Sequence, residues 1–433
     1  MRLRAAWGVA AIVMACVACG SAPSATATPE LRIGVDLPLT GRDARAAVPA
    51  LYGIRFYVQT HPTLDGFRIV LAEADDARGG PPSPSLGVAN VEAFVASSNV
   101  AAMIGPFNSD VARKEVPIAN EAGLAMISPA TSSPCLTRDV FIPAQLNPAR
   151  TPITCKEAGL PAASELRPAH TNNFFRLTTT DDLQGAAAAD YAYAKLHVRR
   201  AAVISDHEVY GQGLADAFSA RLTNLGGGVV GHLDVDPSTA DLTGFLRAMK
   251  DAGARALYYG GTSKAGCGIR SQMRAIFPPG EETPFLGGDG IAHDPACVNL
   301  AGQNSAGVFA TVPFVDAASR PGATALIRDF KAAYGASRDY GPYTLVAYDA
   351  TAVLYTALDR AIRDSGGGRP LRAKITAELA PISNFSGATG TLGFDAAGDT
   401  TNRMISMFEA TGPDPRAPWK LVDAIDYSAH LPY

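Results

Sequence analysis

The sequence predicts an α/β fold made of two tandem blocks, each with a central sheet of mostly parallel strands. Short apolar runs alternate with longer amphipathic segments from residue 31 onward, a pattern typical of βαβ units. This alternation stops at an irregular, proline-rich stretch over residues 129–172 and then resumes. The chain has 433 residues, of which 47% are hydrophobic and 18% charged. Such a length and composition support two or three domains with buried cores.

The first block contains four short apolar runs, which we expect to be strands buried on both faces because they are apolar almost throughout. These runs are residues 31–37, 67–73, 100–105 and 123–128. The segments between them have helical patterns, and the expected helices are residues 44–60, 85–97 and 109–122.

The second block repeats the pattern, and a helical region and a strand-rich tail follow it. Its expected strands are residues 200–206, 228–235, 255–261 and 284–289, and its expected helices are 211–225, 241–252 and 265–276. Beyond residue 312, the expected helices are 322–335, 343–363 and 370–380, and the expected strands are 389–395, 403–410 and 419–425. The later helices need a sheet to cover, and the first block is a candidate. The chain should then cross between the blocks more than once.

The N-terminus has the features of an export signal over residues 1–18, with a basic start and an apolar middle. Its end resembles a bacterial lipobox, in which the chain is cut before a cysteine that then receives lipid. We expect Cys19 to be that cysteine, because cutting there leaves four further cysteines that can pair fully. Cys16 is the rival, and a plain secretory signal is the alternative. Residues 19–30 would form a lipidated tether, and no later segment approaches 18 consecutive apolar residues.

The four remaining cysteines are expected to form two disulfides, because exported proteins meet an oxidising environment. Four cysteines allow three connectivities, and sequence does not choose among them. Local pairing is the simplest and gives Cys135–Cys155 and Cys267–Cys297. Buried free thiols are the alternative.

Charge and motifs exclude several functions. Lys and Arg total 37 against 41 Asp and Glu, a net charge of −4, which does not favour nucleic-acid binding. The seven histidines show no metal-binding spacing, so no metal site is expected. No Walker A or complete G-x-G-x-x-G motif occurs, and no cofactor is expected. No nucleophile motif is complete, so the protein is not expected to be an enzyme.

Polar residues follow the predicted strands where a ligand would bind in an open α/β sheet. Ser109 is expected to cap the next helix, and a helix N-terminus with a hydroxyl can hold a carboxylate. A zwitterion would fit, with its carboxylate at Ser109 and Ser132 and its ammonium at Asp289. Each residue alone is better explained by a cap or a turn, and only their joint occurrence at strand ends favours a site. The strand-end residues considered are Ser109, Ala130, Ser132, Asp206, Tyr210, Thr262 and Asp289.

Eight segments, in order and spacing across some 350 residues, resemble the branched-chain amino-acid (Leu/Ile/Val-type) solute-binding proteins of ABC transporters. These segments are residues 33–41, 101–112, 123–137, 174–185, 201–215, 256–261, 284–291 and 390–399. The resemblance implies the type I periplasmic-binding fold, in which two Rossmann-like lobes joined by three crossovers close on a small solute. The crossovers would lie near 174–178, 310–315 and 389–395. The N-terminal lobe would comprise residues 31–175 and 316–388, and the C-terminal lobe residues 176–315 and 389–433.

The resemblance also assigns roles to site residues. Ser109, Ala130 and Ser132 match groups that hold the solute's carboxylate, and Tyr210 matches a tyrosine that closes over it. The ammonium would be held by Asp289 and by either Asp181 or Asp182. Two departures stand out, because Thr262 and a position near Ala46 occupy places where the family often has tyrosine. The pocket should therefore be roomier or differently shaped.

Together these features predict an extracytoplasmic receptor that captures an amino acid or related solute and delivers it to an ABC permease. It would act as a monomer, anchored by lipid to the outer face of the bacterial cell membrane or located in the periplasm. A sensor of the same fold that reports to a signalling partner is one alternative. A secreted hydrolase is another.

Overall fold

The computed structural model describes residues 28–428, apart from 237, 240, 278–282, 294–306, 336–339 and 413–418. The predicted signal segment, Cys19, most of the tether and Cys297 lie outside the described residues. Within them, none of the helices combines the length and apolar character that a membrane span requires.

The first sheet contains six strands in the order β2-β3-β1-β4-β5-β8. All neighbours are parallel except the short strand β2 (Thr63–Leu64), which is antiparallel to β3. The four strands expected in the first block are present. The parallel strands are β1 (Glu30–Leu37), β3 (Phe67–Asp75), β4 (Val100–Ile104), β5 (Ala125–Ser128) and β8 (Phe174–Arg176).

Helices cover both faces of this sheet. Successive side chains of β4 point to opposite faces of the sheet. Met103 packs with α2 (Pro84–Ala96) and α3 (Ser109–Glu121), whereas Ile104 packs with α1 (Ala44–Thr60) and α10 (Thr344–Asp364). Helix α11 (Arg372–Leu379) lies beside α10 and against β4 and β5. Helix α9 (Thr324–Tyr334) packs with α1 through the rings of Phe56 and Phe330. The late helices therefore return to the first sheet, as expected.

The second sheet contains seven strands in the order β10-β9-β11-β12-β13-β16-β17. The first five are parallel, and the last two are antiparallel additions from the C-terminal tail. The segment expected as a strand over 389–395 instead forms a hairpin of β14 (Phe385–Gly387) and β15 (Gly390–Leu392). The strands of the sheet are β9 (Arg200–Ser205), β10 (Gly228–Asp234), β11 (Ala256–Gly260), β12 (Phe285–Gly287), β13 (Val308–Val312), β16 (Met404–Ala410) and β17 (Trp419–Asp426).

One face of the second sheet packs against α4 (Asp181–Ala194) and α5 (Val209–Asn224), and the other against α6 (Thr243–Asp251) and α7 (Ser263–Ile276). Helix α4 was not predicted from the sequence. Its second and third turns are mostly alanine and are buried on nearly all sides. Such a helix has no polar stripe, so the periodicity that reveals a surface helix is missing.

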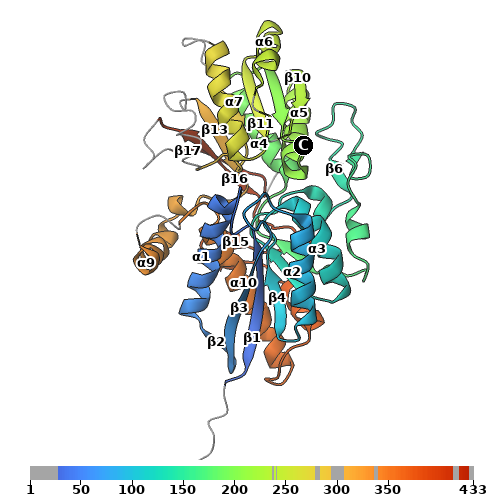
Figure 1. Ribbon diagram of the computed structural model, residues 1–433, viewed down its shortest axis with the longest axis vertical. Helices are drawn as coiled ribbons and strands as arrows, with labels where there is room; N and C mark the ends of the chain where they lie inside the picture. The colour runs from blue at the N-terminus through green and yellow to red at the C-terminus, as the bar shows by residue number, and fades with distance from the viewer. Residues whose placement is uncertain are drawn as a thin grey trace, which may run out of the picture.

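The two sheets form two lobes stacked along the long axis of the molecule (Figure 1). The chain leaves the first sheet after β8, returns to it between β13 and α10, and leaves again between β15 and β16. These three passages agree with the expected crossovers. The lobe boundaries after residues 175, 315 and 388 remain our proposal.

Residues 129–172, which we call the insertion, contain two short 3-10 helices and a small hairpin of β6 (Val140–Ile142) and β7 (Ile153–Thr154). The predicted disulfide Cys135–Cys155 is present and closes this segment. Cys267 is also disulfide-bonded, and Cys297, its predicted partner, lies outside the described residues. The insertion begins and ends in the first lobe, but β6 lies beside α5 of the second (Figure 1).

Three carboxyl groups are completely buried within the first lobe: Asp36 on β1, Asp76 after β3, and Glu115 on α3. The amide of Asn90 donates a hydrogen bond to Asp36 over 2.8 Å. Burial, reinforced by the charge of Asp36, raises the pKa of Asp76 to about 8. Burial also raises the pKa of Asp36 and of Glu115. These raised pKa values favour the protonated form of each group, which reduces the buried negative charge.

We therefore expect the protein to lose stability as the pH rises from 6.5 to 8. In the folded state Asp76 stays mostly protonated until the pH approaches its pKa of about 8, whereas in the unfolded state it is ionised over this whole range, so the folded state binds more protons. The loss from this group amounts to at most about 2 kcal/mol. Urea titrations at the two pH values measure it, and Asp76→Asn should reduce the difference. An equal pH dependence in wild type and variant would contradict the assignment.

Candidate functional site

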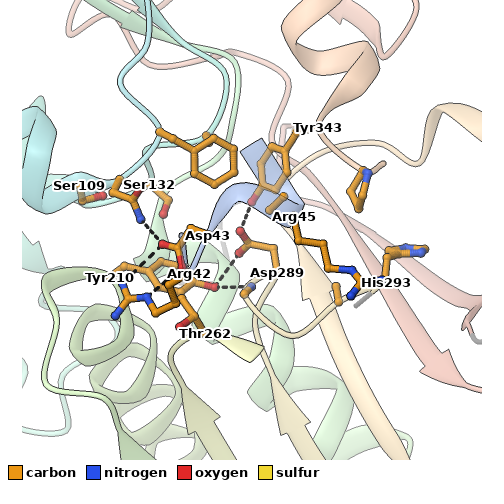
Figure 2. Close-up of a pocket in the computed structure, with 17 residues that line it drawn as sticks. Arg42, Asp43, Arg45, Ser109, Ser132, Tyr210, Thr262, Asp289, His293 and Tyr343 are labelled. Carbon is orange, nitrogen blue, oxygen red and sulfur yellow. Dashed lines mark hydrogen bonds and ion pairs between the residues drawn. The ribbon is translucent and has the colours of Figure 1, made fainter. Parts of the chain in front are cut away.

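A cavity lies between the lobes, at the carboxyl ends of both sheets (Figure 2). Its walls are the loops after β1, β4 and β5 from the first lobe and those after β9, β11 and β12 from the second, together with the start of α10. The cavity volume is about 100 Å³, whereas a single water needs roughly 10–15 Å³ measured in this way. A solute of several heavy atoms therefore fits.

Six of the predicted site residues line this cavity, whereas Asp181, Asp182 and Asp206 do not. Figure 2 shows Ser109 and Ser132 on the side of the first lobe, and Tyr210, Thr262 and Asp289 on the side of the second. The six are Ser109, Ala130, Ser132, Tyr210, Thr262 and Asp289.

The wall from the first lobe presents hydroxyls and backbone groups. Ser109 is the first residue of α3, and the N-cap is Asn108, so the expectation that Ser109 caps the helix was wrong. Its hydroxyl oxygen instead accepts a hydrogen bond from the backbone N–H of Ser133 over 3.2 Å. The positive end of the helix macrodipole favours an anionic group at this wall.

Asp289 follows β12 and accepts hydrogen bonds from three side chains. Gln184 Nε2 donates to Oδ1 over 2.7 Å, and the Tyr210 hydroxyl donates to the same oxygen over 2.9 Å. The Tyr343 hydroxyl donates to Oδ2. Tyr210 is fixed in turn because its oxygen accepts the N–H of Gly290 over 2.9 Å. Three such hydrogen bonds favour the ionised form of the carboxyl group.

The three donors on Asp289 are all uncharged side chains. Burial raises the pKa of Asp289, and the hydrogen bonds from Tyr343, Gln184 and Tyr210 act in the opposite direction. In its ionised form Asp289 would strongly attract a cationic group of a solute in this shielded site, and such a group would in turn favour the ionised form.

At the rim, charged groups join the two lobes. Arg42, in the loop after β1, donates to Glu208 at the N-cap of α5 over 2.7 Å and to Asp43 over 2.9 Å. Asp43 also accepts a hydrogen bond from the amide of Asn108 over 2.8 Å. Together with the bond between Tyr343 and Asp289, these contacts describe a closed arrangement of the lobes.

Asp181 does not line the cavity. It is the first residue of α4, its side chain has no exposed surface, and its backbone N–H donates to the carbonyl oxygen of Ser132 over 2.9 Å. Burial raises the pKa of Asp181 well above its ordinary value, and the nearby Ser132 hydroxyl acts against this shift. The carboxyl group therefore lies behind the serine wall.

The remaining walls are less polar. Thr262 is the N-cap of α7, and its N–H donates to Asp206 over 3.2 Å. The rings of Phe107 and Tyr343 meet edge-to-face with centroids 4.7 Å apart. Burial lowers the pKa of His293 to about 4, so this imidazole is neutral near pH 7. One side of the cavity can therefore hold an apolar group.

Several cavity residues were missed by the sequence analysis. Arg42, Asp43 and Arg45 follow the first strand, and the strand-end rule applied to that strand would have found them. Tyr343 follows no strand and reaches the cavity only because α10 returns to the first lobe. Gln184, which supports Asp289 from α4, gave no signal because that helix was not predicted.

A model of the periplasmic binding protein family matches residues 30–414, which is most of the chain. The chain belongs to the periplasmic binding protein family. The resemblance on which the sequence analysis relied is confirmed by this match, and so is the expected class of solute-binding protein.

Curated relatives of this periplasmic binding protein carry related names. A Leu/Ile/Val-binding protein homolog 3 from Brucella melitensis is 28% identical over 384 residues, covering 88% of this chain and 91% of the relative. An amino acid binding protein from Pseudomonas aeruginosa is 28% identical over 325 residues, which are 75% of each chain.

Solved structures share its fold. A leucine binding protein LivK from Thermotoga maritima has a TM-score of 0.74 at 24% identity and covers 92% of this chain and 99% of its own. A solute-binding protein of an ABC transporter from R. palustris, in complex with benzoate, has a TM-score of 0.71 at 19% identity over 91% and 96% of the two chains. The predicted type I periplasmic-binding fold is therefore confirmed.

Proposed function

We propose that this protein captures a free amino acid between its lobes and delivers it to an ABC permease. The observation that carries the proposal is Asp289, a carboxyl group in a shielded cavity that accepts hydrogen bonds from three uncharged side chains. The solute's ammonium would supply the missing positive charge. Its carboxylate would meet Ser109 at the start of α3 and Ser132 in the loop after β5, and the names of the curated relatives support this choice of solute.

An amino acid suits the cavity better than an aromatic acid, although some proteins of this fold bind benzoates. A solute with a carboxylate alone would satisfy the serine wall but would add a second negative charge close to Asp289. An amino acid satisfies both walls at once. Its side chain would lie toward Phe107 and Tyr343.

Binding would stabilise the closed arrangement. The solute contacts groups from both lobes, so its affinity for the closed state exceeds that for an open state, and closure follows from this difference. No bond of the solute is broken in this scheme, and we propose that the protein is not an enzyme.

A thermal-shift screen tests the proposal, with amino acids, short amides, urea-like compounds and aromatic acids as candidate solutes. A saturating solute raises the melting temperature of the protein that binds it. We expect amino acids to produce the largest shifts, and Ser109→Ala to weaken their binding by about 1.5–3 kcal/mol through loss of a hydrogen bond to a charged group. Shifts confined to aromatic acids would refute the amino-acid assignment.

We further propose that the protein is exported and carries lipid on Cys19, with residues 19–30 as a tether and the two lobes acting as a monomer. The lipobox-like end of the predicted signal supports this location. Mass spectrometry of the N-terminal peptide of the exported protein tests it, because an unmodified Cys19 would contradict the lipid anchor.

A further inference from the structure

We propose that Arg176 is a positioning residue, which fixes the solute-binding loop to the first and third crossovers between the lobes. This loop, residues 129–134, carries Ala130 and Ser132 into the cavity. The inference rests on the proposed function, which assigns those two residues to the solute. It is supported by a set of contacts between Arg176, which does not line the cavity, and the backbone of the loop.

The guanidinium of Arg176 lies at the end of β8 and has no exposed surface. One nitrogen donates to the carbonyl oxygen of Ser133 over 2.7 Å and to that of Thr131 over 3.4 Å. The hydroxyl of Thr178 adds a second hydrogen bond to the Thr131 carbonyl oxygen, over 3.1 Å. The backbone carbonyls of the loop are thus held by buried donors from the first crossover.

The same guanidinium also reaches the third crossover. Arg176 Nε donates to Asp399 over 2.7 Å, and Asp399 lies in the segment between β15 and β16. Arg138 forms a second ion pair with Asp399, over 2.8 Å, on the more exposed side. The planar fork of an arginine can satisfy carbonyl and carboxylate acceptors in fixed directions at once, which a lysine cannot.

The N–H groups of the loop are held by a different partner. The hydroxyl oxygen of Ser128 accepts hydrogen bonds from the N–H of Ala130 over 3.2 Å and of Thr131 over 2.9 Å. The loop is therefore fixed through both its donors and its acceptors before a solute arrives. Such preorganisation strengthens binding because little ordering remains to be done.

A buried ion pair is weak evidence for stability, since removing two charges from water offsets much of their attraction. The role assigned to Arg176 is accordingly local order in the loop. Hydrogen exchange read at single amides separates local order from overall stability, because a general loss of stability speeds exchange throughout the core.

The experiment compares amide hydrogen exchange in wild type, Arg176→Lys and Arg138→Ala, without solute. Arg138→Ala is the control for the shared ion pair, because Arg138 pairs with the same Asp399 and also with Asp395. We expect exchange at residues 130–133 to be at least tenfold faster in Arg176→Lys than in the control, with β9 unchanged. If Arg176→Lys does not fold, Thr178→Val tests the same carbonyl contact, with about threefold faster exchange expected. Equal acceleration in loop and β9, or in variant and control, would overturn the inference.

Calorimetry with L-leucine, L-isoleucine and L-valine then separates the two proposals. If wild type binds one of them, Arg176→Lys should raise the Kd at least tenfold and Arg138→Ala less than twofold. Equal Kd changes in the two variants count against Arg176. If wild type binds no amino acid in the wider screen but the loop exchange still differs, the positioning role stands and the proposed function fails.

Discussion

Replacing Asp289 with asparagine is expected to weaken amino-acid binding at least a hundredfold while the protein remains folded. The substitution keeps the shape of the side chain and removes its charge, so a bound ammonium would lie in a shielded site without an anionic partner. Truncating one partner of a buried charge pair costs about 2–5 kcal/mol, and a hundredfold loss corresponds to about 2.7 kcal/mol. Calorimetry with the amino acid that gives the largest thermal shift measures the effect.

Asp43→Asn is the matched control for this prediction. Asp43 also lines the cavity, but it is already paired with Arg42, and Arg42 keeps Glu208 as a partner. We expect less than a fivefold loss of affinity from this change. Equal losses in the two variants would show that the cavity responds to its overall charge, and the role given to Asp289 would then be wrong.

Removal of the Cys135–Cys155 disulfide is expected to destabilise the insertion by about 3 kcal/mol, because the bond closes a loop with a sequence separation of 20. Both cysteines are buried, so the double variant Cys135→Ala/Cys155→Ala avoids placing new polar groups in the core. Hydrogen exchange across residues 138–160 and guanidinium unfolding measure the loss.

The strands of the first lobe serve as the reference for this experiment. Exchange there should change far less than in the insertion, because the core residues of β1 and β4 belong to other hydrophobic clusters than those of the hairpin of β6 and β7. Unchanged protection of residues 138–160 in the double variant would mean that packing against α5 alone holds the insertion.

The sequence predicted the sheets better than the site. Strands such as β4 and β9 are almost continuous apolar runs, because both of their faces are buried, and such runs can be recognised in the sequence. Asp289 was found because it follows a strand, and parallel strands end at the same edge of a sheet. What sequence could not supply was the partner set of Asp289, because Gln184 and Tyr343 come from elements whose placement depends on the crossovers.

Asp181 shows a second limit. The matching of motifs placed an acid at this position, but a shift of one residue at a helix N-terminus turns a side chain by about 100° around the axis. Here the carboxyl group points behind the serine wall and is fully buried. A shift of one residue therefore decides whether a side chain contacts the solute or is buried beside the cavity, and the matching of motifs does not fix a position to within one residue.

The insertion affects how the two lobes can rotate about the crossovers. It is anchored in the first lobe, where Asn120 accepts a hydrogen bond from Ala169 and donates one to Thr171, and it is stiffened by its disulfide. Its far side packs on α5, where the amide of Asn224 donates to the carbonyl of Gln145 over 2.7 Å. Rotation of the second lobe about the crossovers must slide α5 along this stiff support or separate the two. The part of the insertion over residues 138–172, which forms no wall of the cavity, would thereby restrict how far the lobes can open.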